Sequence, residues 1–257
     1  MNIYKFYNTY GWKEKNNISK DAELFEDLRK NSKNYVSNCR KRILKYIPNK
    51  GQHILDFASG PLQYKEYLEY SKNYKFRHCV DFSKSAIESA KKKLKKKGKY
   101  YCGNFFNIKF KKDFFDCILS MHTIYHIKKE KQKNAILKLL KIAKKGAPII
   151  IVYSNPDTII SKIKKIFKDK SNQKKKLYFF CHPNDWWLQF DKFSKIKFYP
   201  WRSFSSGHQK IIFPNNLFGK IMFSILFFLE EKFKDFFINN FQYQIIILKK
   251  KIIIDYI

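Results

Sequence analysis

Five short apolar segments, each followed by a polar turn, recur between residues 53 and 155 and constrain the fold more than any other feature. They begin at His53, Phe76, Tyr100, Phe115 and Ala147. Stretches with helical spacing of apolar residues lie between most of them, over residues 64–70, 84–97 and about 135–143. Strands that alternate with helices are typical of a parallel sheet covered on both faces. The sequence therefore predicts an α/β fold with a doubly wound, mostly parallel sheet.

The turn after the first segment is a predicted ligand site. Ile54 and Leu55 lead to the carboxylate of Asp56, and small residues that include Gly60 follow. Pro61 has a fixed φ and no N–H, which suit the first position of a helix. Because open α/β sheets bind ligands at the carboxyl ends of their strands, we expect a crevice at this turn.

The chain is strongly basic, with a formal net charge of +33. Such a charge suggests nucleic acid or an anionic membrane surface as a partner. Only five of the 54 basic residues are arginines, although arginine reads phosphates and guanines better than lysine does. Abundant Lys, Ile, Asn and Phe are what A- and T-rich codons produce, so we attribute the charge to codon composition and do not expect a nucleic-acid partner.

The cysteines predict neither a disulfide framework nor a metal site. They number five and contain no C-x-x-C spacing, which fits a reducing interior. Residues 1–8 lack the sustained apolar region of a signal peptide. The longest apolar stretch, residues 221–229, is far below the roughly 20 residues that span a bilayer. We therefore expect a soluble, cytoplasmic protein without a metal ion.

The turns together resemble those of class I S-adenosylmethionine-dependent methyltransferases. The family's first motif is an apolar strand, an acidic residue and a Gly-x-Gly-x-Gly loop, which Asp56 and Gly60 match. Ala58 and Leu62 replace the two outer glycines. The resemblance covers residues 53 to about 155 and implies S-adenosylmethionine as the cofactor. It also implies that Gly60 lets the backbone approach the methionine part of the cofactor, while Asp56 orders the loop or contacts the cofactor's amino group.

Two further turns resemble the family's second and third motifs. Asp81 ends the second segment, where a carboxylate can accept hydrogen bonds from both hydroxyls of a ribose. Asn104 stands where the family has an acidic residue that holds the adenine amino group. The residues that the resemblance assigns to the cofactor are Asp56, Ala58, Ser59, Gly60, Asp81, Phe82, Asn104, Phe105 and Ser120. A nicotinamide or flavin oxidoreductase is disfavoured, because its phosphate-binding loop needs three glycines and only one is present.

The loop after the fourth segment carries the predicted catalytic residues. The resemblance places this segment beside both cofactor and acceptor, and methyl transfer to a hydroxyl requires removal of a proton. A histidine has a suitable pKa range, so His122 or His126 is the predicted base and Tyr125 is expected to shape the pocket. The alternative for either histidine is that it only packs on the cofactor or bonds to backbone.

The resemblance also implies a single methyltransferase domain over residues 1–257 with a seven-stranded sheet. We expect an N-terminal helical lid over residues 1–46, a cofactor-binding core over 47–158, a substrate-side insertion over 159–193, and strands with an apolar helix over 194–257. Residues 196–204 and 243–248 are the predicted last strands. The resemblance implies that the final strand is antiparallel and is inserted beside the fifth.

Three regions outside the core have two interpretations each. The aromatic residues between Tyr4 and Trp12 are either a lid or an anchor for the N-terminus, and those between Tyr178 and Trp187 either face an acceptor or hold the insertion on the core. Residues 217–237 form a core helix or touch a membrane surface. Asp21 and Asp185 are predicted helix caps.

Three functions remain open from sequence. The favoured one is a methyltransferase acting on a small-molecule, sugar or lipid acceptor, for which Arg202 and nearby serines offer a polar patch that suits an anionic group. An RNA methyltransferase is the second, and a non-catalytic relative that serves as a binding or membrane-associated protein is the third. No oligomeric state is predicted.

Overall fold

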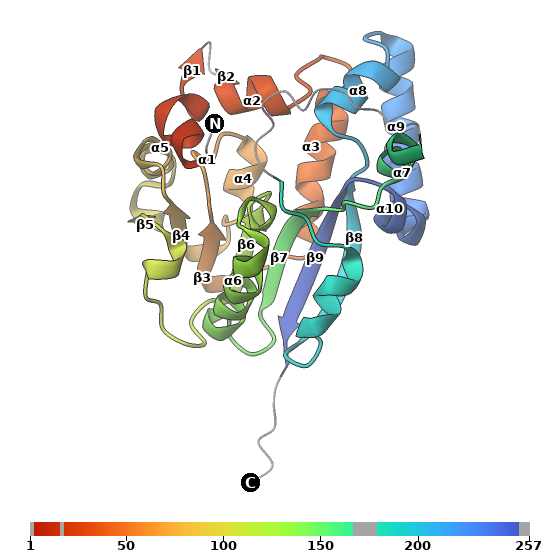
Figure 1. Cartoon of the computed structure of the whole chain (residues 1–257). Helices are drawn as coiled ribbons and strands as arrows, with labels where there is room; N and C mark the ends of the chain where they lie inside the picture. Colours follow the sequence, from red (N-terminus) through yellow and green to blue (C-terminus); the bar gives the residue numbers. More distant parts are fainter. Residues whose placement is uncertain (1–2, 16–17, 167–178, 252–257) are drawn as a thin grey trace.

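A computed structural model describes residues 3–15, 18–166 and 179–251. At its centre lies a seven-stranded sheet with the order β5-β4-β3-β6-β7-β9-β8 (Figure 1). The strands are β3 (Gly51–Phe57), β4 (Tyr74–Asp81), β5 (Gly98–Cys102), β6 (Cys117–Met121), β7 (Pro148–Ser154), β8 (Ser194–Arg202) and β9 (Tyr243–Lys250). The five segments predicted from the apolar pattern are therefore strands.

The sheet confirms the expected mixed topology. Strands β3 to β7 pair in parallel, whereas β9 lies between β7 and β8 and is antiparallel to both. The chain runs from β3 outward to β4 and β5 and then returns to β6 on the other side of β3. The strand order thus reverses beside β3, and ligands bind at such a switch point in open α/β sheets.

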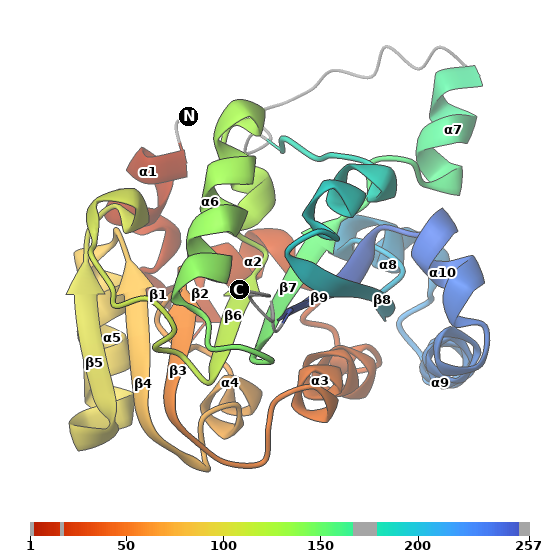
Figure 2. The ribbon, with the colours of Figure 1, turned by 90° about the horizontal axis from the view of Figure 1, so that it is seen from below.

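Helices cover both faces of the sheet, because each strand of the core buries both of its faces. In Figure 2, α6 (Lys129–Ile142) covers one face, while α3 (Lys33–Lys41) and α4 (Lys65–Glu69) lie on the other. Leu55 and Phe57 pack on the α6 side, and Ile54 packs on the α3 side, as the two-residue period of a strand requires. Helix α5 (Lys84–Leu94) packs beside β4 through Ile87 and Ala90.

Several short elements lie over the carboxyl ends of the strands. They are α1 (Ile3–Phe6), a π-helical turn (Tyr7–Gly11), the hairpin β1 (Glu14–Lys15) and β2 (Ile18–Ser19), α2 (Lys20–Phe25) and α8 (Ser206–Ile212). Figure 1 shows α1, α2 and α8 at the same end of the molecule. The remaining helices are α7 (Ile159–Ile166), α9 (Leu217–Lys232) and α10 (Lys234–Asn240).

Three local predictions were wrong. Pro61 lies in a turn, and the following helix begins only at Lys65. The cap of α2 is Ser19, whose hydroxyl accepts from the N–H of Ala22, whereas Asp21 points into the cavity described below. A helical turn over residues 184–190 carries the two tryptophans, but no side chain caps it.

The predicted core helix over residues 217–237 is instead a surface structure of two helices. Helix α9 is anchored to α3 by the fully buried Glu230, which accepts a 2.6 Å hydrogen bond from the hydroxyl of Tyr35 and lies 2.8 Å from Arg42, just after α3. Its other face remains open, with Leu217 and Phe218 exposed to 71% and 63%. Within the described residues, no helix combines the length and apolarity needed to cross a membrane. Residues 167–178 of the predicted insertion lie outside the described residues.

Candidate active site

The loop after β3 keeps the backbone conformation of a glycine-rich turn even where glycine is absent. The φ angles of Ala58, Gly60 and Leu62 are +57°, +56° and +52°. Only glycine adopts this left-handed region without strain, which costs other residues about 1–2 kcal/mol each. The replacements at Ala58 and Leu62 therefore change the stability of the loop rather than its course.

Asp81 at the end of β4 fixes this loop. Its Oδ2 accepts a 2.9 Å hydrogen bond from the N–H of Gly60, and its Oδ1 accepts a 2.8 Å hydrogen bond from the N–H of Ser83. Burial raises the pKa of this carboxyl to about 6, and the two N–H donors oppose the rise. Each carboxylate oxygen can accept more than one hydrogen bond, so the same group remains able to accept from ribose hydroxyls.

Asp56 has a different environment from the one expected. Its carboxylate is buried and pairs with the guanidinium of Arg77, which is also buried and donates to the carbonyl of Tyr67. The loop-ordering role predicted for Asp56 is therefore performed by Asp81. Arg77 was not predicted as part of this site, although an arginine inside a buried strand implies a buried acidic partner.

The turn after β5 presents Gly103, Asn104 and Phe105 to the same space. The N–H of Gly103 donates to the carbonyl of Asp81 at 2.9 Å, so the second and third turns are joined. Oδ1 of Asn104 caps the next turn by accepting from the N–H of Phe106 at 3.0 Å. The ring of Phe105 is buried and stacks on Phe57 with 4.1 Å between centroids.

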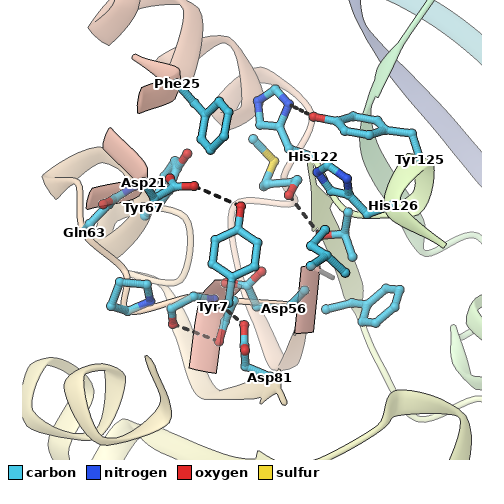
Figure 3. Close-up of a pocket in the computed structure, with 18 of the residues that line it drawn as sticks. Tyr7, Asp21, Phe25, Asp56, Gln63, Tyr67, Asp81, His122, Tyr125 and His126 are labelled. Carbon is cyan, nitrogen blue, oxygen red and sulfur yellow. Dashed lines mark hydrogen bonds between the residues drawn. The ribbon is translucent and has the colours of Figure 1, made fainter. Parts of the chain in front are cut away.

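The histidine loop after β6 lies opposite these turns (Figure 3). His122 has a φ of +57°, and its Nδ1 lies 2.9 Å from the hydroxyl of Tyr125. Burial lowers the pKa of His122 well below its usual value, and the positive charge of Arg202 lowers it further. His122 is therefore a neutral imidazole at physiological pH. The ring of His126 packs against Phe179, with 5.0 Å between centroids.

The N-terminal aromatic residues lie on the first two turns. A methyl group built on Gly60 would come within 3.2 Å of the Trp12 ring, and Tyr7 stacks on Trp12 with 4.7 Å between centroids. The Tyr7 hydroxyl donates to Oδ1 of Asp21 at 2.9 Å, which Figure 3 marks. Burial raises the pKa of Asp21 to about 6. Asp21 was predicted only as a helix cap, and no sequence motif marks it as part of this site.

These groups line one continuous cavity of about 1120 Å³. It contains every residue that the sequence assigned to the cofactor or to catalysis except Ser120, which is fully buried within β6 and does not reach the cavity. Among the aromatic residues of the insertion, Phe179 lines the cavity, while Trp187 is buried in the core and Trp186 stacks on His182. The tryptophans therefore anchor the insertion, the second of the two interpretations.

The charge of the cavity wall contrasts with that of the whole chain. Among the described residues that line it, Asp21, Glu26, Asp56 and Asp81 are acidic, Arg77 and Arg202 are basic, and none is lysine. Arg202 is itself paired with Glu26 at 2.9 Å. An acidic, aromatic wall suits a cationic ligand more than an anionic one.

The residues present fit an adenosyl cofactor with a sulfonium group. A methyl group on Gly103 would meet nothing within 4 Å, which leaves room for a ligand there, whereas the Trp12 ring covers Gly60. Asp81 supplies acceptors for ribose hydroxyls at the turn between the two. No cluster of histidine, cysteine and acidic residues suited to a metal ion occurs in the part of the chain that the structure describes.

Comparison with known proteins agrees with this fit. Residues 55–151 match a family model described as a methyltransferase domain. Residues 55–151 thus form a class I S-adenosylmethionine-dependent methyltransferase domain, whose cofactor is S-adenosylmethionine. No curated protein sequence matches it.

Solved structures show the same fold at low identity. The chain is similar to geranyl diphosphate C-methyltransferase from Streptomyces coelicolor A3(2), with 11% identity over 83% of this chain and 77% of that one and a TM-score of 0.55. Phosphoethanolamine N-methyltransferase 2 from Haemonchus contortus aligns with 14% identity over 83% of this chain and 52% of that one, with a TM-score of 0.53. A methyltransferase from Archaeoglobus fulgidus aligns with 18% identity over 86% and 95% and a TM-score of 0.50.

Proposed function

We propose that this enzyme methylates a small-molecule, sugar or lipid acceptor enclosed in the cavity. The observation that carries the proposal is the continuity of the cavity, which joins the turns at Gly60 and Asp81 to the loop at His122. Cofactor and acceptor can therefore meet inside the protein. Within the expected lid over residues 1–46, the part before α3 is the proposed lid, because Tyr7 and Trp12 lie on the cofactor turns, whereas α3 packs on the sheet.

The cofactor, when bound, supplies an electrophilic methyl group on a positively charged sulfur. The protein aligns the acceptor with that group, and alignment is a large part of catalysis in such displacements. For a hydroxyl acceptor, His122 is the proposed proton acceptor in the tautomer whose Nδ1–H donates to the Tyr125 hydroxyl, because Nε2 then carries no hydrogen and can take the substrate proton. Because burial makes the imidazolium costly, His122 first orients the hydroxyl and takes its proton as the new bond to the methyl carbon forms.

The composition of the cavity wall supports a neutral or cationic acceptor over a nucleic acid. Of the 54 basic residues, 49 are lysines, yet none of these lines the cavity within the described part of the chain. A site for a phosphate backbone would need such cations near the reacting group. The lysines that make the chain basic therefore do not reach the cavity, and RNA is the weaker candidate for the methyl acceptor. All five cysteines are unpaired, which supports the proposed cytoplasmic setting.

The test is incorporation of label from S-adenosylmethionine with a tritiated methyl group. The purified enzyme is incubated separately with a water-soluble metabolite extract, a lipid extract and total RNA. The proposal predicts label in one of the first two, and loss of that label with His122→Ala, whose cofactor affinity is measured in parallel. Label confined to RNA, or no label with intact cofactor binding, contradicts it.

A further inference from the structure

The mouth of the cavity opens in an exposed apolar surface, which we call the rim patch. It consists of Leu24, Phe25, Leu28, Ile211, Ile212, Leu217, Phe218 and Ile221. We infer that the rim patch docks on an anionic lipid bilayer and that the acceptor is a lipid taken from it. This inference rests on the proposed function and narrows its acceptor class.

The rim patch is one surface although its residues come from distant parts of the chain. Arg29 donates to the carbonyls of Gln209 and Phe213 at 2.9 and 2.7 Å. The side chain of Asn31 donates to the carbonyl of Pro214 at 2.6 Å. These bonds hold the segment after α2 against α8 and the start of α9, at the end of the molecule where Figure 1 shows α2 and α8.

The rim patch is continuous with the interior of the active site. Ile211 is 83% exposed and Phe25 is 36% exposed, and both side chains also line the cavity. Figure 3 shows Phe25 on the cavity wall, on the same side as His122. An acyl chain that enters between Phe25 and Ile211 contacts apolar side chains both outside the molecule and at the mouth of the cavity. A polar metabolite entering the same way gains nothing from them.

Charge at the rim selects a bilayer with anionic head groups. The exposed charged residues of segments 20–33 and 206–221 are five lysines, at positions 20, 30, 33, 210 and 220, and a single acid, Glu23. Apolar side chains surrounded by lysines are the pattern of proteins that lie in a membrane interface, where the chains insert and the ammonium groups meet lipid phosphates. A nucleic acid would leave the apolar residues in water.

Vesicle flotation tests the docking directly. The full chain is mixed with vesicles of phosphatidylcholine alone or of equal parts phosphatidylcholine and phosphatidylglycerol. The test variant is Leu217→Ser/Phe218→Ser/Ile221→Ser, whose residues are exposed and do not line the cavity. The control is Leu188→Ser, an apolar residue of similar exposure in the turn over residues 184–190. A charge variant, Lys210→Glu/Lys220→Glu, tests the lysines.

The expected result is flotation with the anionic vesicles only. The triple variant should lose at least about tenfold in partitioning because three apolar side chains no longer insert. The charge variant should lose at least about fivefold per lysine. Leu188→Ser should partition like the wild type. Wild-type protein that stays in the soluble fraction with all vesicles overturns the inference, and so does a triple variant that floats like the wild type. This holds even if the rim patch proves to bind a second copy of the chain instead.

Two further readouts separate this inference from the proposed function. Calorimetry with S-adenosylhomocysteine should show equal affinity in the wild type and all three variants, and thermal unfolding should confirm that each is folded. Tritiated methyl label should then enter lipid of the anionic vesicles supplemented with a total polar lipid extract, and the triple variant should transfer about tenfold less. If the cofactor binds but the protein does not float, only docking on a bilayer is rejected. If label enters only water-soluble metabolites, the lipid acceptor is rejected, but the proposed methyl transfer is retained.

Discussion

The backbone N–H of Gly60 donates a 2.9 Å hydrogen bond to Oδ2 of Asp81 and so joins the first turn of the cofactor site to the end of the neighbouring strand. The N–H of Gly103 in turn donates to the carbonyl of Asp81. Three turns from three strands thus meet at one residue. This arrangement holds the cofactor loop in place although two of the three expected glycines are missing.

The strain at Ala58 predicts that glycine at this position stabilises the protein. Its φ of +57° is unfavourable for alanine and free for glycine. Ala58→Gly should raise the free energy of unfolding by about 0.5–1 kcal/mol, after the larger chain entropy of glycine is subtracted. Chemical denaturation measures this. Ala86→Gly inside helix α5 is the matched control and should destabilise by about 1 kcal/mol; an Ala58→Gly variant that is equally destabilised contradicts the strained loop.

Asp21 predicts a stability difference that depends on pH. Its pKa is raised from 3.8 to about 6, so between these values the folded state holds a proton that the unfolded state releases. The stability that the protonated carboxyl contributes is therefore lost as the pH rises through the pKa of the folded state. Relative to wild type, Asp21→Asn should therefore gain up to about 3 kcal/mol in the free energy of unfolding between pH 4 and pH 7. Parallel denaturation curves at several pH values give this difference. A difference that does not vary with pH is the contrary result.

The pair His122 and Tyr125 predicts separate effects on binding and on turnover. His122→Ala should lower kcat by about 10²–10⁴ with a hydroxyl acceptor and leave S-adenosylhomocysteine affinity unchanged. Tyr125→Phe removes the 2.9 Å contact that orients the imidazole and should lower kcat by about tenfold. Because the pKa of His122 is well below its usual value, the wild-type rate should not fall between pH 8 and pH 6 through its protonation. Unchanged turnover in both His122→Ala and His126→Ala would remove the histidines from catalysis.

The buried pair Asp56 and Arg77 predicts a large loss of stability when one partner is removed. Arg77→Met leaves the carboxylate of Asp56 buried and unpaired, which should cost about 3–5 kcal/mol. The double variant Asp56→Leu/Arg77→Met removes both charges and should recover a large part of that loss. Urea denaturation of both variants compares them. Equal stabilities of the single and double variants would show that the loss comes from packing and not from the unpaired charge.

Much of the fold follows from the sequence because the strands carry their own signals. The run at Ile149 is apolar on both faces and Ile54 and Leu55 point to opposite faces, which is typical of a covered parallel sheet. The antiparallel position of β9 came from the family resemblance, not from local pattern. The helix over residues 217–237 was misjudged because its apolar residues surround the axis, and burial depends on neighbours that the sequence does not reveal.

The candidate site was predictable only where a residue ends a strand. Asp81 ends β4 and Gly60 follows the end of β3 by three residues, and both were assigned from the resemblance of these turns to the family's motifs. Asp21 and Trp12 reach the same cavity from an N-terminal segment with no regular pattern, so no sequence rule locates them. Arg77 was missed because its partner, Asp56, had been assigned to the cofactor. Ser120 was assigned to the cofactor from the resemblance, yet its side chain is fully buried within β6 and does not line the cavity.

Asp81 tests the central claim, that the cofactor binds at the meeting point of the three turns. Isothermal titration calorimetry with S-adenosylhomocysteine compares the wild type with Asp81→Asn, which keeps the size of the side chain and removes its charge and one acceptor. We expect the wild type to bind one equivalent and Asp81→Asn to bind at least about tenfold more weakly, while the thermal unfolding of the variant remains cooperative. Equal affinity in the two proteins, or no binding by the folded wild type, would contradict the account.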